Sequence, residues 1–238
     1  RVMVCLPEGA QWITIPDSAI LPDRLSVDIA GEAQGTSLKA TLTLRESGDY
    51  WGLRIAAHRG GIKGLRDLLM TRYFDLPATA QFEVAKMGVP MDLTAPFEVV
   101  LRVSHPEGFR RNGGEFELPA WGMPAVFGMV QKSGVPRRYP IASTASGDLT
   151  LHASLSLPER VQPVLPARKG ESPFRTFTWA ATSRPKGEGT LLELNLEHHL
   201  RPASFGFEQR DKGLQAWKQD RSLMKSLRED GLALKSGS

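Results

Sequence analysis

The chain has 238 residues, 41% hydrophobic and 24% charged, which is the composition of an ordinary globular protein that can bury a core without disulfides or structural metal. Its net charge of +4 comes from 30 basic and 26 acidic residues scattered along the chain, and this scatter argues against a nucleic-acid-binding face. A single cysteine excludes an internal disulfide and multi-cysteine metal sites, and no apolar run reaches the roughly 20 residues of a transmembrane segment.

The chain begins with a strand-like run around its only cysteine. Cys5 stands between Val4 and Leu6 and is followed by turn residues at 7–9. A nucleophilic cysteine needs a base and a setting that lowers its pKa, such as a glycine-rich helix start, and no such start follows here. Five histidines leave open a partner in space. Because free cysteine commonly behaves as a small buried residue, we interpret Cys5 as structural.

A period-two alternation of apolar and polar residues dominates the chain and is typical of half-buried β-strands. It predicts a hairpin with apolar positions at 38–44 in one strand and 51–57 in the other, joined by turn residues at 47–49. Further strands are predicted at 97–103, 149–157, 177–181 and 192–200. Such strands, separated by turns rich in glycine and proline, favour sandwich-like β units.

Two stretches change to helical spacing. In GGIKGLRDLLMTRYF the apolar residues recur at intervals of three and four, which predicts a short helix near 62–72. Towards the end of the chain, Leu214, Trp217, Met224 and Leu227 recur at intervals of three and seven between polar residues. This pattern predicts an amphipathic helix near 208–229 that docks on the sheet through those four side chains.

The domain organisation follows from these elements. We expect a mainly β fold with two sandwich-like β units, a short internal helix and a C-terminal amphipathic helix. The segment 86–96 contains one glycine and two prolines between alternating runs and predicts a boundary. The predicted units are 1–88, a first β unit with the short helix; 89–204, a second β-sandwich unit; and 205–238, the C-terminal helix and tail.

The pair His198–His199 is the candidate for metal binding. Neighbouring side chains of a strand point to opposite faces, so His198 shares a face with the leucines and His199 with Glu193 and Glu197. His199 and Glu197 could ligate one ion together, but the sequence does not identify a third ligand. We therefore expect a buried, hydrogen-bonded His198, a surface His199, and no metal or other cofactor.

The segment HRGGIKGLR, residues 58–66, resembles an anion cradle, because glycines precede a helix that carries Lys63 and Arg66, with Arg59 before them. The phosphate-loop spacing GxxxxGK[ST] and the dinucleotide fingerprint GxGxxG are both absent. We interpret the glycines as turn residues that enter a helix.

Catalytic and sugar-binding signals are weak elsewhere. No carboxylate pair stands out as a general acid and base, and no GxSxG nucleophile elbow is present. Trp121 lies between two prolines and could stack on a sugar, although a lone tryptophan is more often a packing anchor. The sequence therefore predicts no catalytic, cofactor-binding or metal-ligating residue.

Several segments follow one another in a distinctive order. They are EAQGTSLKATLTLRESGDYWG, FEVVLRVSHPEGFRRNGGEFELP, RRYPIAST, LHASLSLPERVQPVLP, TLLELNLEHHLRPASF and LQAWKQDRSLMKSLRED. This succession, from about residue 12 to residue 230, resembles the C-terminal region of bacterial transglutaminase-like proteins, which carry β-sandwich domains of unknown function on both sides of a papain-like core.

The resemblance implies a module without its own chemistry. In that family a Cys, His and Asp triad lies in the core that precedes this region, and Cys5 lacks the helix context of the family's nucleophile. We expect the tail of a longer chain, in the periplasm or outside the cell, that positions the upstream catalytic core or its substrate. The alternatives are a stand-alone periplasmic or surface module that binds a carbohydrate or protein, and a small unrecognised hydrolase.

Overall fold

The computed structural model describes residues 2–6, 9–13, 23–48, 52–70, 79–112, 115–118, 141–143, 147–230 and 233–237. The predicted mainly β fold is confirmed. The strands are β1 Val2–Leu6, β2 Gly9–Ile13, β3 Arg24–Gln34, β4 Ser37–Ser47, β5 Gln81–Met87, β6 Phe97–His105, β7 Arg110–Asn112, β8 Glu115–Glu117, β9 Ile141–Ser143, β10 Gly147–Leu157, β11 Val161–Pro163, β12 Ala167–Ser172, β13 Arg175–Lys186, β14 Gly189–Leu200, β15 Ala203–Phe205 and β16 Ala233–Ser236. The helices are α1 Leu53–Leu68 and α3 Arg210–Asp230, and a 3₁₀ turn at Phe207–Gln209 precedes α3.

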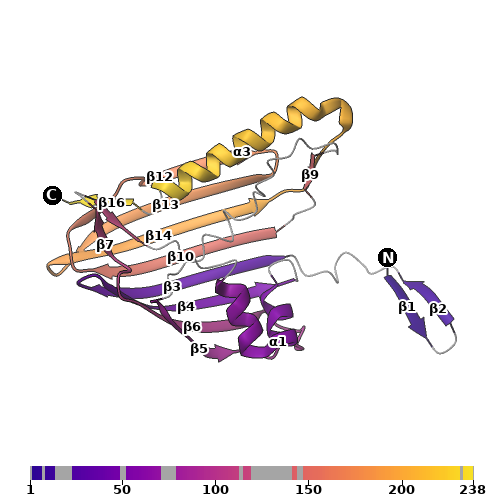
Figure 1. The fold of residues 1–238 in the computed structure, drawn as a ribbon, viewed down its shortest axis with the longest axis horizontal. Coiled ribbons are helices and arrows are strands. Elements are labelled where there is room, and N and C mark those ends of the chain that lie inside the picture. The colour runs from indigo at the N-terminus through magenta and orange to yellow at the C-terminus, as the bar shows by residue number, and fades with distance from the viewer. Residues whose placement is uncertain are drawn as a thin grey trace.

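Eight of the described strands form one long twisted sheet (Figure 1). Their order is β12-β13-β14-β10-β3-β4-β6-β5. Neighbours are antiparallel except at the centre, where β10 and β3 are parallel. Smaller sheets are β11-β16-β8-β7, β15-β9 and β1-β2. None of the helices in the described part of the chain is long and apolar enough to cross a membrane.

The large sheet has one apolar face and one polar face, as the alternation in its strands requires. The buried side chains of the apolar face include Leu25, Val27, Ile29, Leu38, Leu42, Leu44, Phe97, Val99, Leu101, Leu149, Leu151, Leu155, Phe177, Trp179, Leu192, Leu194 and Leu196. Helix α1 packs Leu53 and Leu65 into this core, and α3 adds Met224. Figure 1 shows α1 beside β3–β6 and α3 along β12. The opposite face of the sheet remains the polar one.

The prediction of a strand at 51–57 that pairs with the strand at 38–44 is wrong. The hairpin instead joins β3 to β4 through Gly35, whose φ of 59° suits a tight turn, and the chain enters α1 at Leu53. Leu53 and Ala57 are buried on one helix face, four residues apart, whereas Ile55 between them is exposed. Apolar residues at 53, 55 and 57 alternate as in a strand, but 53 and 57 are also four residues apart, which is the spacing of one helix face. A run this short fits both structures. Trp51 lies outside the described residues.

The helix predicted near 62–72 is the second half of α1. Gly61 has φ 57° and ψ −145°, a conformation outside the helical region, and it kinks α1. The described chain continues helically to residue 70, and residues 71 and 72 lie outside it. The predicted C-terminal helix is confirmed as α3, in which Met224 is buried and Leu214 and Trp217 are half-buried. The side chain of Leu227 lies outside the described part.

The segment 86–96, predicted as a boundary, contains the end of β5 and the loop 88–96, which joins two hydrogen-bonded neighbours in the sheet. β5 pairs antiparallel with β6, so the strands on either side of residue 88 belong to the same half of the sheet. The parallel pairing of β10 with β3 then joins the two halves into one core. Glycine and prolines in this segment build a hairpin loop, which has the same composition as a linker.

Candidate functional site

The two adjacent histidines of β14 lie as the alternation predicts. His198 is fully buried and His199 is exposed on the opposite face, where its Nδ1 lies 2.8 Å from Oδ1 of Asp148. His152 pairs similarly with Asn195, at 2.9 Å between Nδ1 and Oδ1. Within the described ranges, no three histidine, cysteine or carboxylate side chains gather closely enough to hold a metal ion.

The structure describes the backbone of Cys5 but not Trp121. Cys5 lies in β1 opposite Ala10 of β2, so the predicted strand around it is confirmed, although its side chain is outside the described part. Trp121 lies outside the described residues altogether. Neither residue is therefore placed in a site.

The glycines of HRGGIKGLR, predicted as turn residues that enter a helix, lie within α1, and of the three only Gly61 leaves the helical conformation. Gly61 kinks the helix, and Arg59, Lys63 and Arg66 around it are exposed. The N-terminus of α1 lies earlier, where the carboxylate of Glu46 accepts a hydrogen bond of 2.7 Å from the backbone N–H of Arg54. A carboxylate of this chain therefore already occupies the position at which a helix attracts an anion.

Glu46 is a buried charge that the sequence analysis missed. Its side chain is inaccessible to solvent, and its Oε1 has no hydrogen-bond partner among the described residues. Burial raises its pKa, while hydrogen bonds from the backbone of Arg54, Gly52 and Leu53 oppose the rise. Glu46 shares the apolar parity of Leu42 and Leu44, so a carboxylate on the core side of a strand is the signal that could have found it.

A second buried polar cluster lies under α3. The Arg175 Nε donates to Oδ1 of Asp220 at 2.8 Å, and the Ser172 hydroxyl donates to the same oxygen at 2.7 Å. The Arg175 Nη1 lies 3.3 Å from Nε2 of His198. Burial, and to a smaller extent Arg175 and His199, lowers the pKa of His198 to about 3.

This cluster contains serine, histidine and aspartate, but it does not have the geometry of a nucleophilic triad. A triad requires the serine hydroxyl to donate to the histidine, and Ser172 donates to Asp220 instead. Arg175 occupies the position between histidine and carboxylate. The cluster therefore connects the sheet to α3 and does not activate a hydroxyl.

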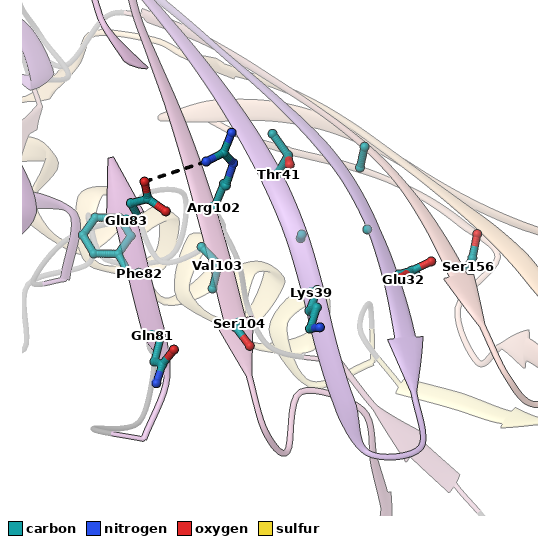
Figure 2. A pocket seen from close by; sticks show the side chains of 13 residues that line it. Glu32, Lys39, Thr41, Gln81, Phe82, Glu83, Arg102, Val103, Ser104 and Ser156 are labelled. Atoms are coloured by element: carbon teal, nitrogen blue, oxygen red, sulfur yellow. Dashed lines mark ion pairs between the residues drawn. The ribbon is translucent and has the colours of Figure 1, made fainter. Parts of the chain in front are cut away.

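A polar hollow of about 620 Å³ lies on the open face of the sheet, across β5, β6, β4, β3 and β10 (Figure 2). Register places its residues in rows: Gln81, Ser104, Lys39, Glu32 and Ser156 lie side by side on successive strands. The next row runs Glu83, Arg102, Thr41 and Ala30. The small side chains of Thr41 and Ala30, next to the long Arg102 in this row and to Lys39 and Glu32 in the first, leave the surface hollowed.

The charges of the hollow are solvent-exposed. Arg102 Nη1 lies 3.8 Å from Oε1 of Glu83, and these side chains are 68% and 67% exposed. An exposed pair at this distance contributes at most about 1 kcal/mol to stability, so its side chains can exchange partners at little cost. Lys39, Glu32, Ser104 and Ser156 add further donors and acceptors around the same hollow.

A chain of partly exposed ion pairs crosses the same strands in the neighbouring rows. Arg45 lies 2.6 Å from Asp28 and 2.9 Å from Glu98, and Lys86 lies 2.9 Å from the other oxygen of Glu98. Hydrogen bonds from Lys86 and Arg45 lower the pKa of Glu98. These ion pairs link side chains of β3, β4, β6 and β5, the strands that also carry most of the hollow.

The sequence analysis did not identify the hollow, although its signal is present in the strands. Lys39 and Thr41 were recognised as the polar side of their strand, as was Arg102 of the next. Which strands lie next to one another decides that these residues meet, and alternation within a strand carries no information on pairing.

Comparison of the chain with known protein families, with curated proteins and with solved structures finds no match in any of the three.

Proposed function

We propose that this chain is a non-catalytic accessory β module that acts by contact, using the open polar face of its large sheet. The observation that carries the proposal is the hollow, where side chains of both charges and several hydroxyls surround a depression on a sheet whose strands also carry ion pairs. Mixed charges of this kind favour a polar protein surface, because electrostatic complementarity sets orientation and specificity.

The resemblance to transglutaminase-like proteins suggests the partner. The proposed role is to position a papain-like catalytic core, or the protein substrate of that core, against the face that carries the hollow. Contacts between domains of one polypeptide typically bury about 600–1,500 Å² and are more polar than a core. The exposed Lys39 and Arg102 would then pair with carboxylates of the partner.

A glycan ligand is the competing possibility, and the lining residues argue against it. Sugar-binding surfaces commonly offer an aromatic ring for stacking. The aromatic residue that lines this hollow, Phe82, has its ring 5.9 Å from the guanidinium of Arg66 on α1. That ring is engaged with the helix on the apolar side of the sheet.

Titration of the fluorescently labelled chain with the upstream catalytic core, produced separately, tests the proposal. We expect weak, specific and salt-sensitive binding, reduced by Lys39→Glu and Arg102→Glu and unchanged by Lys218→Glu on the exposed surface of α3. No association at high micromolar concentration would refute the accessory role. Glycan binding that is lost in the same two variants would instead support the carbohydrate-binding module.

A further inference from the structure

The loop between β5 and β6, residues 88–96, exposes large apolar side chains. Val89 is 69% exposed, and Met91 and Leu93 are each 66% exposed. These are the three most exposed large hydrophobic side chains in the described part of the chain. Clustered exposed apolar side chains mark interaction sites, whereas single ones are ordinary. The loop therefore stands out from the rest of the surface.

The backbone of the 88–96 loop is ordered by its own sequence. Pro90 occupies the second position of a β-turn that closes with a 3.1 Å hydrogen bond from the Asp92 N–H to the Val89 carbonyl. The Oδ1 of Asp92 then accepts from the backbone N–H of Thr94 at 3.0 Å and from its hydroxyl at 2.6 Å. Two successive turns thus fix the backbone on either side of Met91 and Leu93.

A buried arginine holds the loop from below. Arg54 is 6% exposed, and its guanidinium donates to the carbonyl of Ala95 at 2.7 Å, to that of Pro90 at 3.2 Å, and to that of Asp92. The guanidinium also lies 5.6 Å from the ring centre of Phe97. One cation therefore ties three loop carbonyls to α1, and a surface so pre-organised loses little conformational entropy on binding.

We propose that the 88–96 loop inserts Met91 and Leu93 into an apolar pocket of a partner protein that carries a basic side chain beside that pocket. Asp92 lies between the two apolar residues and supplies the complementary charge. This surface is separate from the hollow, whose residues on β5 and β6 lie towards the opposite ends of those strands. The inference therefore does not depend on the proposed function.

The charge of Asp92 selects a protein partner over two other occupants. Hydrogen bonds from Thr94 lower the pKa of Asp92, so the carboxylate stays ionised and resists entry into a bilayer. Two copies meeting symmetrically through this loop would bring their Asp92 carboxylates together, and like charges disfavour that contact. A different protein that has an apolar pocket with a basic group beside it accommodates the apolar side chains in the pocket and pairs with the carboxylate.

Selection from a library of random short peptides displayed on phage, with the whole chain immobilised, tests the inference. The unmodified chain is expected to enrich peptides that combine apolar residues with lysine or arginine. Asp92→Asn, which removes the charge but keeps an Oδ1 acceptor for Thr94, should abolish the preference for lysine and arginine. The double variant Met91→Ser/Leu93→Ser should weaken binding of a synthesised enriched peptide at least about tenfold. Ile62→Ser, which removes an equally apolar side chain that is 57% exposed on α1, should leave binding unchanged.

Four results would overturn the inference: no enrichment, an unchanged preference for lysine and arginine in Asp92→Asn, equal binding to the double variant, and a loss of binding in Ile62→Ser as large as in the double variant. Binding to phosphatidylcholine–phosphatidylglycerol vesicles that the double variant abolishes would assign the loop to a membrane surface instead. A concentration-dependent dimer lost in the double variant would assign it to a second copy. Circular dichroism melts of each variant confirm that the fold is retained, since all the substituted side chains are exposed.

Discussion

The Nε atom of Arg175 on β13 lies 2.8 Å from Oδ1 of Asp220 on α3, and each side chain is only 4% exposed. This pair joins the C-terminal helix to β13, the second strand of the large sheet, through a charge contact that is almost fully shielded from water. A buried pair of this kind contributes little compared with an apolar replacement, but loss of one partner leaves the other charge desolvated. The contact therefore ties α3 to β13, and breaking it from one side is costly.

Asp220→Ala should lower the free energy of unfolding by about 3–5 kcal/mol, because it leaves the Arg175 charge buried without its carboxylate. The double variant Arg175→Met/Asp220→Leu should recover most of the loss. Urea denaturation measures both. The matched control is Glu171→Ala, which removes the exposed pair with Arg201 and should cost less than about 1 kcal/mol. Equal losses at the two sites would contradict the structural role of the buried pair.

Acid should destabilise the fold through His198. Its pKa is about 3 in the folded chain, well below the ordinary histidine value of 6.5, so the unfolded chain binds the proton first as the pH falls. The stability that this group contributes is complete above pH 6.5 and is lost between 6.5 and 3, at up to about 1.4 kcal/mol per pH unit.

Comparison with His198→Gln isolates this contribution. Between about pH 6 and pH 4, the unmodified chain should lose about 2 kcal/mol more stability than the variant. Burial also lowers the pKa of His105, which likewise reduces stability as the pH falls. Burial raises the pKa of Glu46, which increases stability as the pH falls. Both groups are present in the two proteins, so their effects cancel in the difference. Parallel pH profiles would exclude His198 as the source.

Met224 should contribute more to the docking of α3 than Trp217. Met224 is 3% exposed in the main core, whereas Trp217 is half-buried with the guanidinium of Arg221 5.6 Å from its ring centre. We expect Met224→Ala to cost about 2–5 kcal/mol, and Trp217→Ala to cost less than the roughly 3–5 kcal/mol of a fully buried aromatic residue. Chemical denaturation of the two variants ranks them, and the reverse order would contradict this packing.

Arg54→Lys should loosen the 88–96 loop, because an ammonium group cannot reproduce the planar guanidinium that reaches three separate carbonyls. We expect faster hydrogen exchange at the N–H of Asp92 and a stability loss of about 1–3 kcal/mol. The matched control is Arg59→Lys, an exposed arginine of the same helix. Unchanged exchange in the loop would show that the turns alone hold it.

Cys5→Ser should leave the fold and binding unchanged, because Cys5 lies in a strand opposite Ala10, where a small side chain fits as well as a thiol. In the unmodified chain, alkylation by iodoacetamide should be no faster than that of free cysteine at neutral pH. A much faster reaction would indicate an activated thiol and reopen the hydrolase hypothesis.

The sequence by itself determined five strands of the large sheet, β4, β6, β10, β13 and β14, and which side of each faces the core, whereas β3, β5 and β12 of the same sheet were not predicted. Period-two alternation reports burial directly, and it alone was enough to separate buried His198 from exposed His199. The amphipathic pattern likewise determined the C-terminal helix, because apolar residues on one helix face report docking in the same way.

Only the tertiary structure decided how these strands pair. The parallel contact between β10 and β3, whose paired residues are more than a hundred positions apart in the sequence, joins two hairpin-rich halves into one sheet and brings Lys39, Arg102 and Ser156 around one hollow. The tertiary structure also buries four charged side chains, Glu46, Arg54, Arg175 and Asp220. A charged side chain is buried only when a distant partner or backbone dipole stabilises it, and local pattern contains no record of that partner.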